Sequence, residues 1–504
     1  MELRRKVSGD AARFRSLLAG AAGIQQRMLR EILARNRDCE YARRYGFAGI
    51  RSYEEFRSQV PVVTYEALRA DIGRLAAGER GVLLGSDVLA FEETGGAAGG
   101  RKLIPHTKAS LDAFRRALRV WLDDLCSNEP QLASGTAYWA ISPACRAPRA
   151  CAARVPIGIG DAQYFGEDLA ADVARILSVP PAVATLGDFE DWRYATTAHL
   201  LADESLAWIS VWSPTFLRTL LQCAVDHGAR LVERHAGSER SARVRAALTA
   251  QVPDFRAIWP NLRLISCWDQ ASSQLPARDL AAAFPGVTLQ GKGLLATEGI
   301  VSIPLGGWHM PVLAIESGFY EFVADDGTPH AAWELTPGAE YEVLLTNDSG
   351  LYRYAIGDRV RVHEYAGGAP TLEFLGRCGV ISDLCGEKLT ESFVLSALAS
   401  DRPGFCVLAA DSDRYVLLLD EEEISPHEAA PLCVRVDAAL ERNPQYAYAR
   451  RVRQLAPVRP EFCRRPMDNF VTTALRQGRR LGDLKTPVLH TTGEWRRIFN
   501  AVQP

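Results

Sequence analysis

Residues 94–102 read Thr-Gly-Gly-Ala-Ala-Gly-Gly-Arg-Lys and follow an apolar run at residues 88–91. A turn this rich in glycine lets the backbone pass close to an anion and point several N–H groups at it, and Lys102 adds a positive charge. The spacing is not that of a P-loop, because Arg101 separates the last glycine from the lysine and Leu103 replaces the metal-binding hydroxyl. The stretch favours a phosphate-binding loop of another kind, with an ordinary tight turn as the alternative.

Three segments downstream carry further chemistry: residues 290–299 (QGKGLLATEG), 350–358 (GLYRYAIGD) and 374–377 (FLGR). A Thr-Glu pair in a turn after an apolar strand can offer a hydroxyl to a phosphate and a carboxylate to Mg²⁺. A Gly-Asp pair at the end of a strand places a carboxylate where it can accept hydrogen bonds from both hydroxyls of a ribose. Together these segments indicate an enzyme that adenylates its substrate.

The order of these motifs resembles the adenylate-forming superfamily, and more closely the Gretchen Hagen 3 (auxin-responsive) acyl acid amido synthetase family in a form typical of bacteria. Further sequence motifs that resemble those of the family lie at residues 53–66, 139–143, 211–217, 265–268 and 341–346. The resemblance therefore extends from about residue 30 to about residue 490. It implies an α/β adenylate-forming fold. Residues 1–380 would form a large domain with layered α/β sheets and a β-rich, barrel-like part, and residues 381–504 a small, mobile α+β lid.

The resemblance also implies roles for individual residues. The predicted ATP-binding set is Thr94, Gly95, Gly96, Ala97, Ala98, Gly99, Thr297, Glu298, Tyr352, Asp358, Arg377 and Lys388. Glu298 would also hold Mg²⁺ that arrives with ATP, and is predicted to be catalytic together with Lys485, which lies in a segment resembling the one that bears the lid lysine. The structural alternatives are a solvated turn for Glu298, an ion pair with Arg359 for Asp358, and surface salt bridges for Arg377.

One departure from the family pattern concerns the phosphate loop. Gly95, Ala97 and Ala98 stand where relatives commonly carry hydroxyls, and only Thr94 remains. The backbone N–H groups survive these changes, but each lost hydrogen bond removes about 0.5–1.5 kcal/mol. The sequence therefore leaves open how these replacements alter the use of ATP.

Composition excludes several other classes. The chain has 504 residues, enough for two or more packed units, and its net charge of −3 argues against a nucleic-acid surface. No apolar stretch of about 18 residues and no signal-peptide core is present, so we expect a cytoplasmic protein with no membrane partner. Eleven dispersed cysteines without a CxxC pair are interpreted as buried small hydrophobes.

Trp139, Trp212 and Trp268 are interpreted as core aromatics, with walls of the acyl pocket as the alternative that the resemblance implies.

Periodicity predicts several elements. Residues 12–34 are expected to form an amphipathic helix. The glycine-rich stretch is expected to lead into a helix capped by Thr107. Beyond a flexible boundary at residues 376–388, the predicted elements are a helix at 391–399, a hairpin about residues 411–413, a helix at 426–442 and a strand at 451–455.

The sequence therefore predicts an ATP-dependent acyl acid amido synthetase. A small carboxylic acid would react with Mg·ATP to give acyl-AMP and pyrophosphate, and an amine or amino acid would then take the acyl group. Two alternatives stay open: transfer to a thiol of coenzyme A or of a carrier protein, and a relative that binds nucleotide or an acyl ligand without turnover. The identity of the acid and of the amine, and the oligomeric state, are not predicted.

Overall fold

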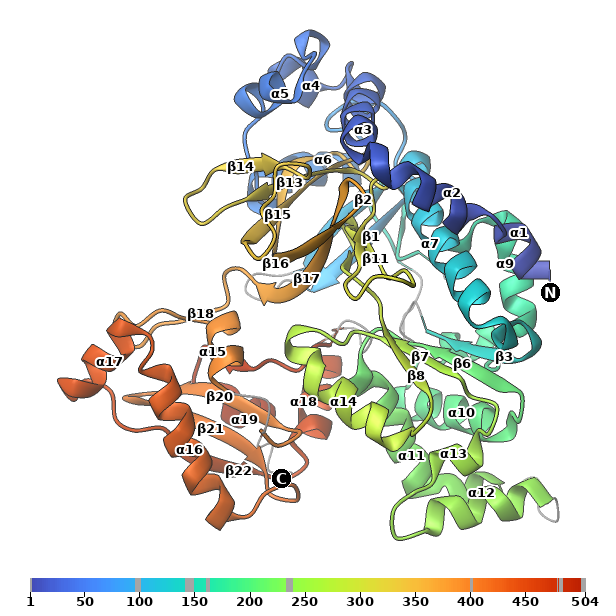
Figure 1. Cartoon of the computed structure of the whole chain (residues 1–504), viewed down its shortest axis with the longest axis vertical. Coiled ribbons are helices and arrows are strands. Elements are labelled where there is room, and N and C mark those ends of the chain that lie inside the picture. The colour runs from blue at the N-terminus through green and yellow to red at the C-terminus, as the bar shows by residue number, and fades with distance from the viewer. Residues whose placement is uncertain are drawn as a thin grey trace. The chain divides into compact units, whose positions relative to one another are not determined.

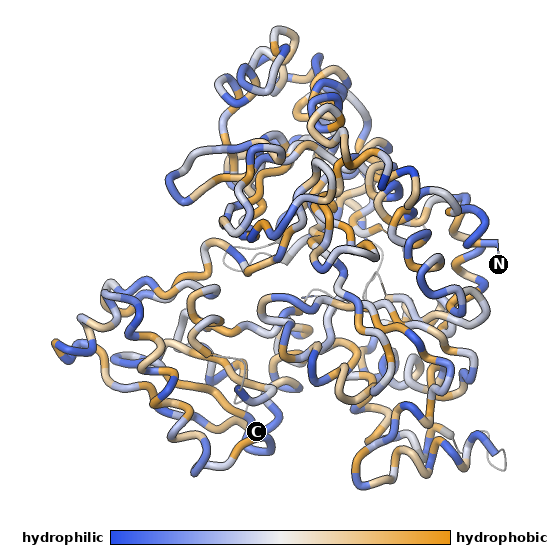
Figure 2. The backbone as a smooth tube through the Cα atoms, in the orientation of Figure 1, coloured by the Kyte–Doolittle hydropathy of each residue, from blue (hydrophilic) through white to orange (hydrophobic). Residues whose placement is uncertain are grey.

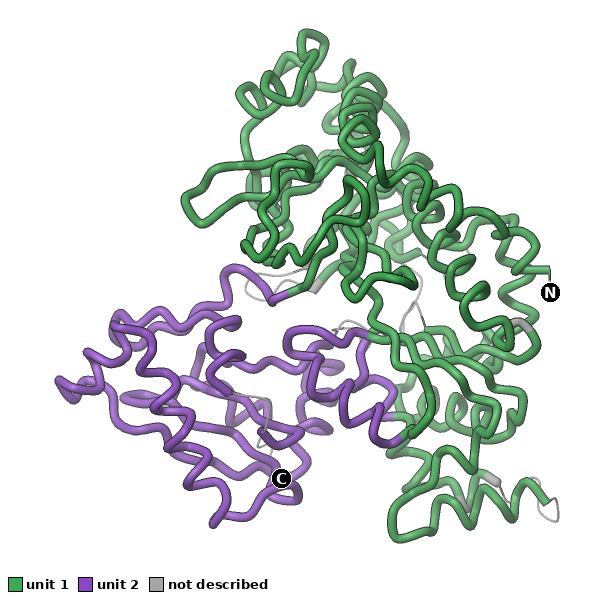
Figure 3. The backbone as a smooth tube through the Cα atoms, viewed as in Figure 1, with its two compact units in different colours: residues 1–212, 220–267, 284–374 green, residues 213–219, 268–283, 375–504 purple. Residues whose placement is uncertain are grey.

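The computed structural model describes residues 2–95, 101–140, 149–159, 164–232, 239–398, 402–477, 479 and 484–499. The chain forms two compact units (Figure 3). Unit 1 comprises residues 1–212, 220–267 and 284–374, and unit 2 comprises residues 213–219, 268–283 and 375–504. This division differs from a single cut at residue 380, because two segments from the first part of the chain pack with the C-terminal part.

A parallel four-stranded sheet lies in unit 1, with the strand order β3-β6-β7-β8. Its strands are β3 (Thr136–Trp139), β6 (Leu206–Ser210), β7 (Leu264–Cys267) and β8 (Thr288–Gly291). Strands β6 and β7 are buried along their whole length, as their continuous apolar sequences require in the middle of a parallel sheet. The register pairs Ser210 with both Trp139 and Ser266, so the strands end together at one edge.

A larger sheet in unit 1 is built from the β-rich part of the sequence, in the order β11-β12-β17-β16-β15-β13-β14 (Figure 1). Its strands are β11 (Ser302–Ile303), β12 (Val312–Leu313), β13 (Phe319–Val323), β14 (Pro329–Ala331), β15 (Glu340–Asn347), β16 (Leu351–Ala366) and β17 (Ala369–Arg377). Antiparallel ladders join β13 to β14 and β15, and β15 to β16. The long β16 carries the Gly-Asp motif.

The glycine-rich stretch lies between two antiparallel strands, β1 (Ala90–Gly95) and β2 (Arg101–His106). These strands belong to a small sheet with β4 (Arg149–Ala150) and β5 (Pro156–Ile157). The expected passage from this stretch straight into a helix is therefore wrong, because β2 intervenes. The helix itself, α7 (Lys108–Asn128), is confirmed with its cap: the Thr107 hydroxyl accepts from the N–H of Ser110 at 3.2 Å.

The single helix expected at residues 12–34 is divided into α2 (Asp10–Leu17), the 3₁₀ turn η1 (Leu18–Gly20) and α3 (Ala21–Asn36). The break coincides with a tight contact: the Gly368 N–H donates to the carbonyl of Leu18 at 2.8 Å. A side chain on Gly367 would meet the Leu18 backbone at 3.0 Å. The tertiary contact thus interrupts a pattern that is helical by periodicity alone.

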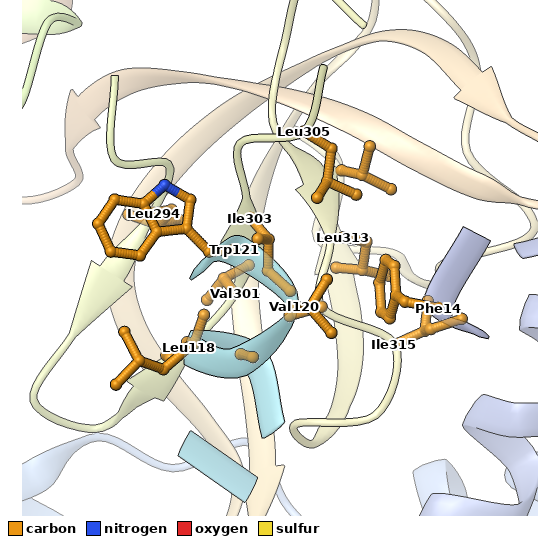
Figure 4. Close-up of a cluster of buried hydrophobic side chains, with 14 of the residues drawn as sticks. Phe14, Leu118, Val120, Trp121, Leu294, Val301, Ile303, Leu305, Leu313 and Ile315 are labelled. Carbon is orange, nitrogen blue, oxygen red and sulfur yellow. The ribbon is translucent and has the colours of Figure 1, made fainter. Parts of the chain in front are cut away.

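The main core of unit 1 joins α7 to the strands that follow β8. Figure 4 shows Leu118, Val120 and Trp121 of α7 packed among Leu294, Val301, Ile303 and Leu313. Burial of such a cluster is the dominant favourable term in folding. It anchors the segment after β8 against α7.

Unit 2 contains a four-stranded sheet in the order β22-β21-β20-β23. Its strands are β20 (Cys406–Asp411), β21 (Arg414–Asp420), β22 (Arg459–Cys463) and β23 (Leu489–His490), and its helices include α15 (Glu391–Ala397), α16 (Pro426–Leu440), α17 (Pro444–Arg451), α18 (Pro466–Arg476) and α19 (Trp495–Phe499). The inner strands β20 and β21 are mostly apolar (Figure 2). The predicted hairpin and the helices at 391–399 and 426–442 are confirmed. The strand predicted at 451–455 is wrong: α17, which begins after the Asn443 cap, ends at Arg451, residues 452–455 form a turn, and the strand β22 begins only at Arg459.

The remaining elements are α1 (Glu2–Val7), α4 (Glu40–Arg44), η2 (Phe47–Gly49), α5 (Tyr53–Gln59), α6 (Tyr65–Ala76), η3 (Pro130–Ser134), α9 (Glu167–Ile176), η4 (Pro181–Thr185), α10 (Phe189–Ala202), α11 (Pro214–Val232), α12 (Glu239–Thr249), α13 (Phe255–Ile258), η6 (Ala271–Ser273), α14 (Gln274–Ala283), β9 (Leu295–Ala296), β10 (Gly299–Ile300), β18 (Ile381–Ser382) and β19 (Leu389–Thr390). No helix in the described part of the chain has the length and hydrophobicity needed to cross a bilayer. Cys385 is exposed, contrary to the expectation of buried cysteines.

Candidate active site

A pocket opens at the carboxyl edge of the parallel sheet in unit 1, with a cavity volume of about 50 Å³. Ligands of α/β proteins commonly bind outside the carboxyl ends of parallel strands. The lining residues are Phe114, Ala117, Leu118, Trp121, Trp139, Ala140, Trp212, Lys292, Leu295, Ile300, Ser302, Ile303 and Pro304. Trp139 and Trp212 therefore form pocket walls, which favours the alternative to a purely core role.

Lys292 directly follows β8 and contributes the one ionisable side chain among these lining residues. Its ammonium donates to the Ser210 hydroxyl at 2.8 Å and to the Ser266 hydroxyl at 3.5 Å. It also lies 5.4 Å from the centre of the Trp121 ring. The next residue is a glycine because a Cβ on Gly293 would lie 2.5 Å from the carbonyl oxygen of Ser302.

The electrostatic environment of Lys292 is unusual for a lysine. Burial lowers its pKa to about 7, and the neighbouring Cys267 acts in the opposite direction. No carboxylate pairs with its ammonium within the described ranges. Sequence reasoning quoted the segment around Lys292 but gave this residue no role. The available signal was a single lysine in an otherwise apolar run after a strand.

The stability of the protein is expected to rise, relative to a Lys292→Met variant, as the pH increases from 7 to 9. The pKa of Lys292 is about 7 in the folded state and 10.5 in the unfolded state, so between these values the unfolded chain binds more protons. The wild type should gain about 2 kcal/mol over this range, measured by urea unfolding at each pH. A Lys108→Met variant, at an exposed position, should follow the wild type; equal pH profiles for Lys292→Met and wild type would contradict the lowered pKa.

Thr297 and Glu298 form the turn of the β9–β10 hairpin, in which Leu295 pairs with Ile300. Both of these paired residues line the pocket. Glu298 is 8% exposed, and its backbone carbonyl accepts from the Asn347 side chain at 2.6 Å. The predicted Thr-Glu motif thus lies on the same short hairpin that forms one wall of the pocket.

The Gly-Asp motif lies in β16, where Asp358 is 4% exposed. Burial raises the pKa of the nearby Glu342, Arg359 opposes that shift, and the charge of Asp358 adds to it. Asp358 and Glu342 therefore form an acidic pair on the larger sheet.

Tyr352, which sequence reasoning placed in the ATP-binding set, packs in the core of unit 1. Its side chain is 0% exposed, its ring stacks on Tyr41 with centres 5.1 Å apart, and its hydroxyl donates to the Leu83 carbonyl at 2.8 Å. These contacts satisfy the hydroxyl and cover the ring. We therefore leave Tyr352 out of the nucleotide site proposed below.

The next residue, Arg353, makes a buried ion pair that sequence reasoning missed. Its guanidinium lies 2.9 Å from the Glu321 carboxylate, with side-chain exposures of 4% and 1%. It also donates to the carbonyls of Arg57 and Val60, both at 2.8 Å. The middle of the Gly-Leu-Tyr-Arg-Tyr-Ala-Ile-Gly-Asp motif thus connects β16 to β13 and to the C-terminal end of α5.

Only part of the predicted phosphate loop can be placed. Thr94 pairs with Lys102, and Gly95 with Arg101, at the open end of the β1–β2 ladder. Gly96, Ala97, Ala98 and Gly99 lie outside the described residues. The Lys102 ammonium is 5.5 Å from the centre of the Tyr65 ring.

Unit 2 brings two of the predicted residues to one carboxylate. Burial raises the pKa of Glu391, while the charges of Lys485 and Arg377 lower it. The Lys485 ammonium also lies 4.5 Å from the centre of the Trp268 ring, a cation–π distance. Lys388 stands apart in an exposed turn before β19, with a left-handed φ of 44°.

Two family models match this chain. The GH3 family N-terminal domain matches residues 10–289, and the GH3 family central domain matches residues 311–377. The chain belongs to the GH3 family. This membership confirms the resemblance on which the sequence prediction depended.

Two plant proteins illustrate the similarity to other members of the family. Indole-3-acetic acid-amido synthetase GH3.3 of Arabidopsis thaliana is 23% identical over 421 residues, which is 74% of this chain and 70% of the relative. Probable indole-3-acetic acid-amido synthetase GH3.1 of Oryza sativa subsp. japonica is 24% identical over 458 residues, 81% of this chain and 75% of the relative. These relatives are named as amido synthetases, which are ligases that form amide bonds.

Solved structures show the same fold. The AtGH3.15 acyl acid amido synthetase in complex with 2,4-DB matches with a TM-score of 0.85 at 20% identity, over 98% of this chain and 95% of that one. A 2-hydroxyisobutyryl-CoA ligase in complex with R3-HIB-AMP matches with a TM-score of 0.56 at 14% identity, over 97% and 92%. The predicted adenylate-forming fold is confirmed.

Proposed function

We propose that this protein is an ATP-dependent acyl acid amido synthetase. It activates a small carboxylic acid as acyl-AMP and then transfers the acyl group to an amine or amino acid. The observation that carries the proposal is an apolar pocket with one ammonium, at the carboxyl edge of the parallel sheet, in a chain of the GH3 family. Such a pocket suits an acid whose carboxylate is the only charged group.

The nucleotide site is proposed from residues in unit 1. Asp358 would accept hydrogen bonds from the ribose hydroxyls, Thr297 would donate to the α-phosphate, and the backbone from Thr94 to Gly99 would hold the outer phosphates. The described residues hold no group of three or more metal-ligating side chains, so phosphate oxygens would complete the coordination of Mg²⁺ beside Glu298. When bound, the ion would neutralise phosphate charge.

The chemistry has two steps. In the first, an oxygen of the carboxylate attacks the α-phosphorus, and the bond to pyrophosphate breaks. In the second, the amine nitrogen attacks the acyl carbon, AMP leaves, and the amine loses a proton. Lys485 would stabilise the negative charge that grows on the α-phosphate during the first step, with Arg377 as a second cation and Lys388 as a further nucleotide contact.

The test is acid-dependent exchange of labelled pyrophosphate into ATP across a panel of carboxylic acids. Exchange with at least one acid, followed by a product with the mass of an amide, is the expected result. A thioester as the only product would support the thiol alternative, and ATP binding without any exchange would support a non-catalytic relative. Both outcomes would overturn the proposal.

Two carboxylate variants test the nucleotide site. Glu298→Gln and Asp358→Asn are each expected to lower exchange by about 10²-fold or more, because each removes a charged acceptor without changing size. Glu364→Gln serves as the matched control, since Glu364 is an exposed carboxylate on the same strand as Asp358. Exchange at the wild-type rate in either site variant would remove that residue from the site.

A further inference from the structure

The pocket in unit 1 has a single ionisable group in an apolar lining. Three indole rings surround it: Trp139 lies edge-on to Trp121, with ring centres 5.5 Å apart, and Trp212 lies 5.6 Å from the Lys292 ammonium. Ser302 also lines the pocket; its hydroxyl accepts from the Leu294 N–H at 2.9 Å and carries no charge. Among these lining residues, Lys292 is therefore the one that can pair with a charge on a ligand.

The hydrogen bonds of Lys292 to described residues pair its charge with no counter-ion among them. An ammonium has three donors, and the Ser210 and Ser266 hydroxyls account for two of them. Neither hydroxyl carries a charge, and Cys267 is the titratable neighbour that acts on the ammonium. Because a buried charge without a partner is costly, an anionic ligand would gain both a donor and an opposite charge here.

We propose that Lys292 binds the carboxylate of the acid and that the pocket selects a compact, apolar monocarboxylate. This inference rests on the proposed function, because it names the substrate class of the same site. Lys292 touches the reacting carboxylate and holds it in place. It keeps its proton, while the free carboxylate oxygen attacks the α-phosphorus.

Charge and size both restrict the substrate. One ammonium can neutralise one carboxylate, so a dicarboxylate would bring a second charge against the indole and aliphatic walls with no partner. The cavity volume of about 50 Å³ is roughly a third of the 150 Å³ cavity that accepts benzene in a protein core. The pocket therefore has room for the chain of a short acid, whereas an indole acid would extend beyond this volume or displace the walls.

The first experiment measures binding without turnover. Butyrate, butyramide, succinate and indole-3-acetate are titrated into wild-type protein, Lys292→Met and Lys108→Met, with quenching of the pocket tryptophans as the signal. Butyrate should bind at least about 10-fold more tightly than the other three ligands, and Lys292→Met should weaken butyrate binding by about 10- to 100-fold without changing butyramide binding. Lys108→Met should match the wild type.

A second readout separates recognition of charge from a packing role. At pH 8 the free amine of Lys292 is mostly neutral, so butyrate binding should draw a proton from the buffer. The calorimetric enthalpy should therefore depend on the ionisation enthalpy of the buffer in wild type and not in Lys292→Met. Equal affinity for butyrate in both proteins, or no butyrate binding by wild type, would overturn the inference.

Pyrophosphate exchange distinguishes failure of this inference from failure of the proposed function. If wild type exchanges with some acid and Lys292→Met keeps the same KM for that acid, the inference fails and the amido synthetase proposal stands. If wild type exchanges with no acid, the proposed function fails whatever Lys292 binds. A KM for the acid raised by about 10- to 100-fold, with the KM for ATP unchanged, is the expected result.

Discussion

A Lys485→Ala variant is expected to lose about 10²- to 10³-fold of its ATP–pyrophosphate exchange rate, because one preorganised cation at a developing charge contributes this much. The ammonium lies over the Trp268 ring at 4.5 Å and near the carboxylate of Glu391, so its position is set by packing within unit 2. The rate is measured at saturating acid and ATP. Lys485→Arg keeps the charge and should recover part of it.

The role assigned to Lys485 is confined to adenylation. If synthetic acyl-AMP is supplied, Lys485→Ala should still form amide at a rate close to that of the wild type. Lys108→Ala, at an exposed position of α7, is the matched control and should leave both half-reactions unchanged. Loss of the transfer step together with a lowered melting temperature would instead indicate that Lys485 acts through the stability of unit 2.

An Arg353→Met variant is expected to lower the free energy of unfolding by about 3–5 kcal/mol, because it leaves the Glu321 carboxylate buried without its partner. Glu321 is 1% exposed and also accepts from the Tyr53 hydroxyl at 3.2 Å. The Arg57 and Val60 carbonyls lose their donor in the same variant. Urea unfolding measures the change.

The double variant Glu321→Met/Arg353→Met tests the cause. It should be more stable than Arg353→Met alone, since no buried charge remains. Arg69→Met provides the control: it removes an ion pair with Glu66 at 2.7 Å whose side chains are 44% and 67% exposed, and should cost less than about 1 kcal/mol. A double variant less stable than the single one would contradict the buried-charge explanation, because both proteins equally lack the Arg353 hydrogen bonds to the Arg57 and Val60 carbonyls.

These contacts divide the motif at residues 350–358 into two parts. Tyr352 and Arg353 make buried contacts within the core: the Tyr352 hydroxyl donates to the Leu83 carbonyl, and Arg353 pairs with the Glu321 carboxylate. Asp358, farther along β16, is the part that we assign to the nucleotide. The sequence prediction placed Tyr352 and Asp358 together in the ATP-binding set and gave Arg353 no role, because a motif does not by itself separate residues that hold a strand in place from residues that bind a ligand.

The amino-acid sequence by itself determined the features that depend on neighbouring residues and on the sequence motifs of the family. The GH3 family and its fold follow from motifs spread over most of the chain. Thr107 was predicted as a helix cap because a cap involves residues three apart, and the hairpin of β20 and β21 because its turn residues are adjacent. The break at Leu18 and the helix at residues 444–451 were missed, because contacts with distant segments or competing caps override periodicity.

Only the tertiary structure decided what surrounds Lys292. Ser210 and Ser266 lie 82 and 26 residues away in sequence, yet both reach its ammonium, because β6, β7 and β8 run parallel in a register that ends all three strands at one edge. Periodicity reports which face of an element is apolar, but not which strands become neighbours. Lys292 therefore acquires its lowered pKa, and the role we propose for it, only when the strands assemble and bury its side chain at the edge of the sheet.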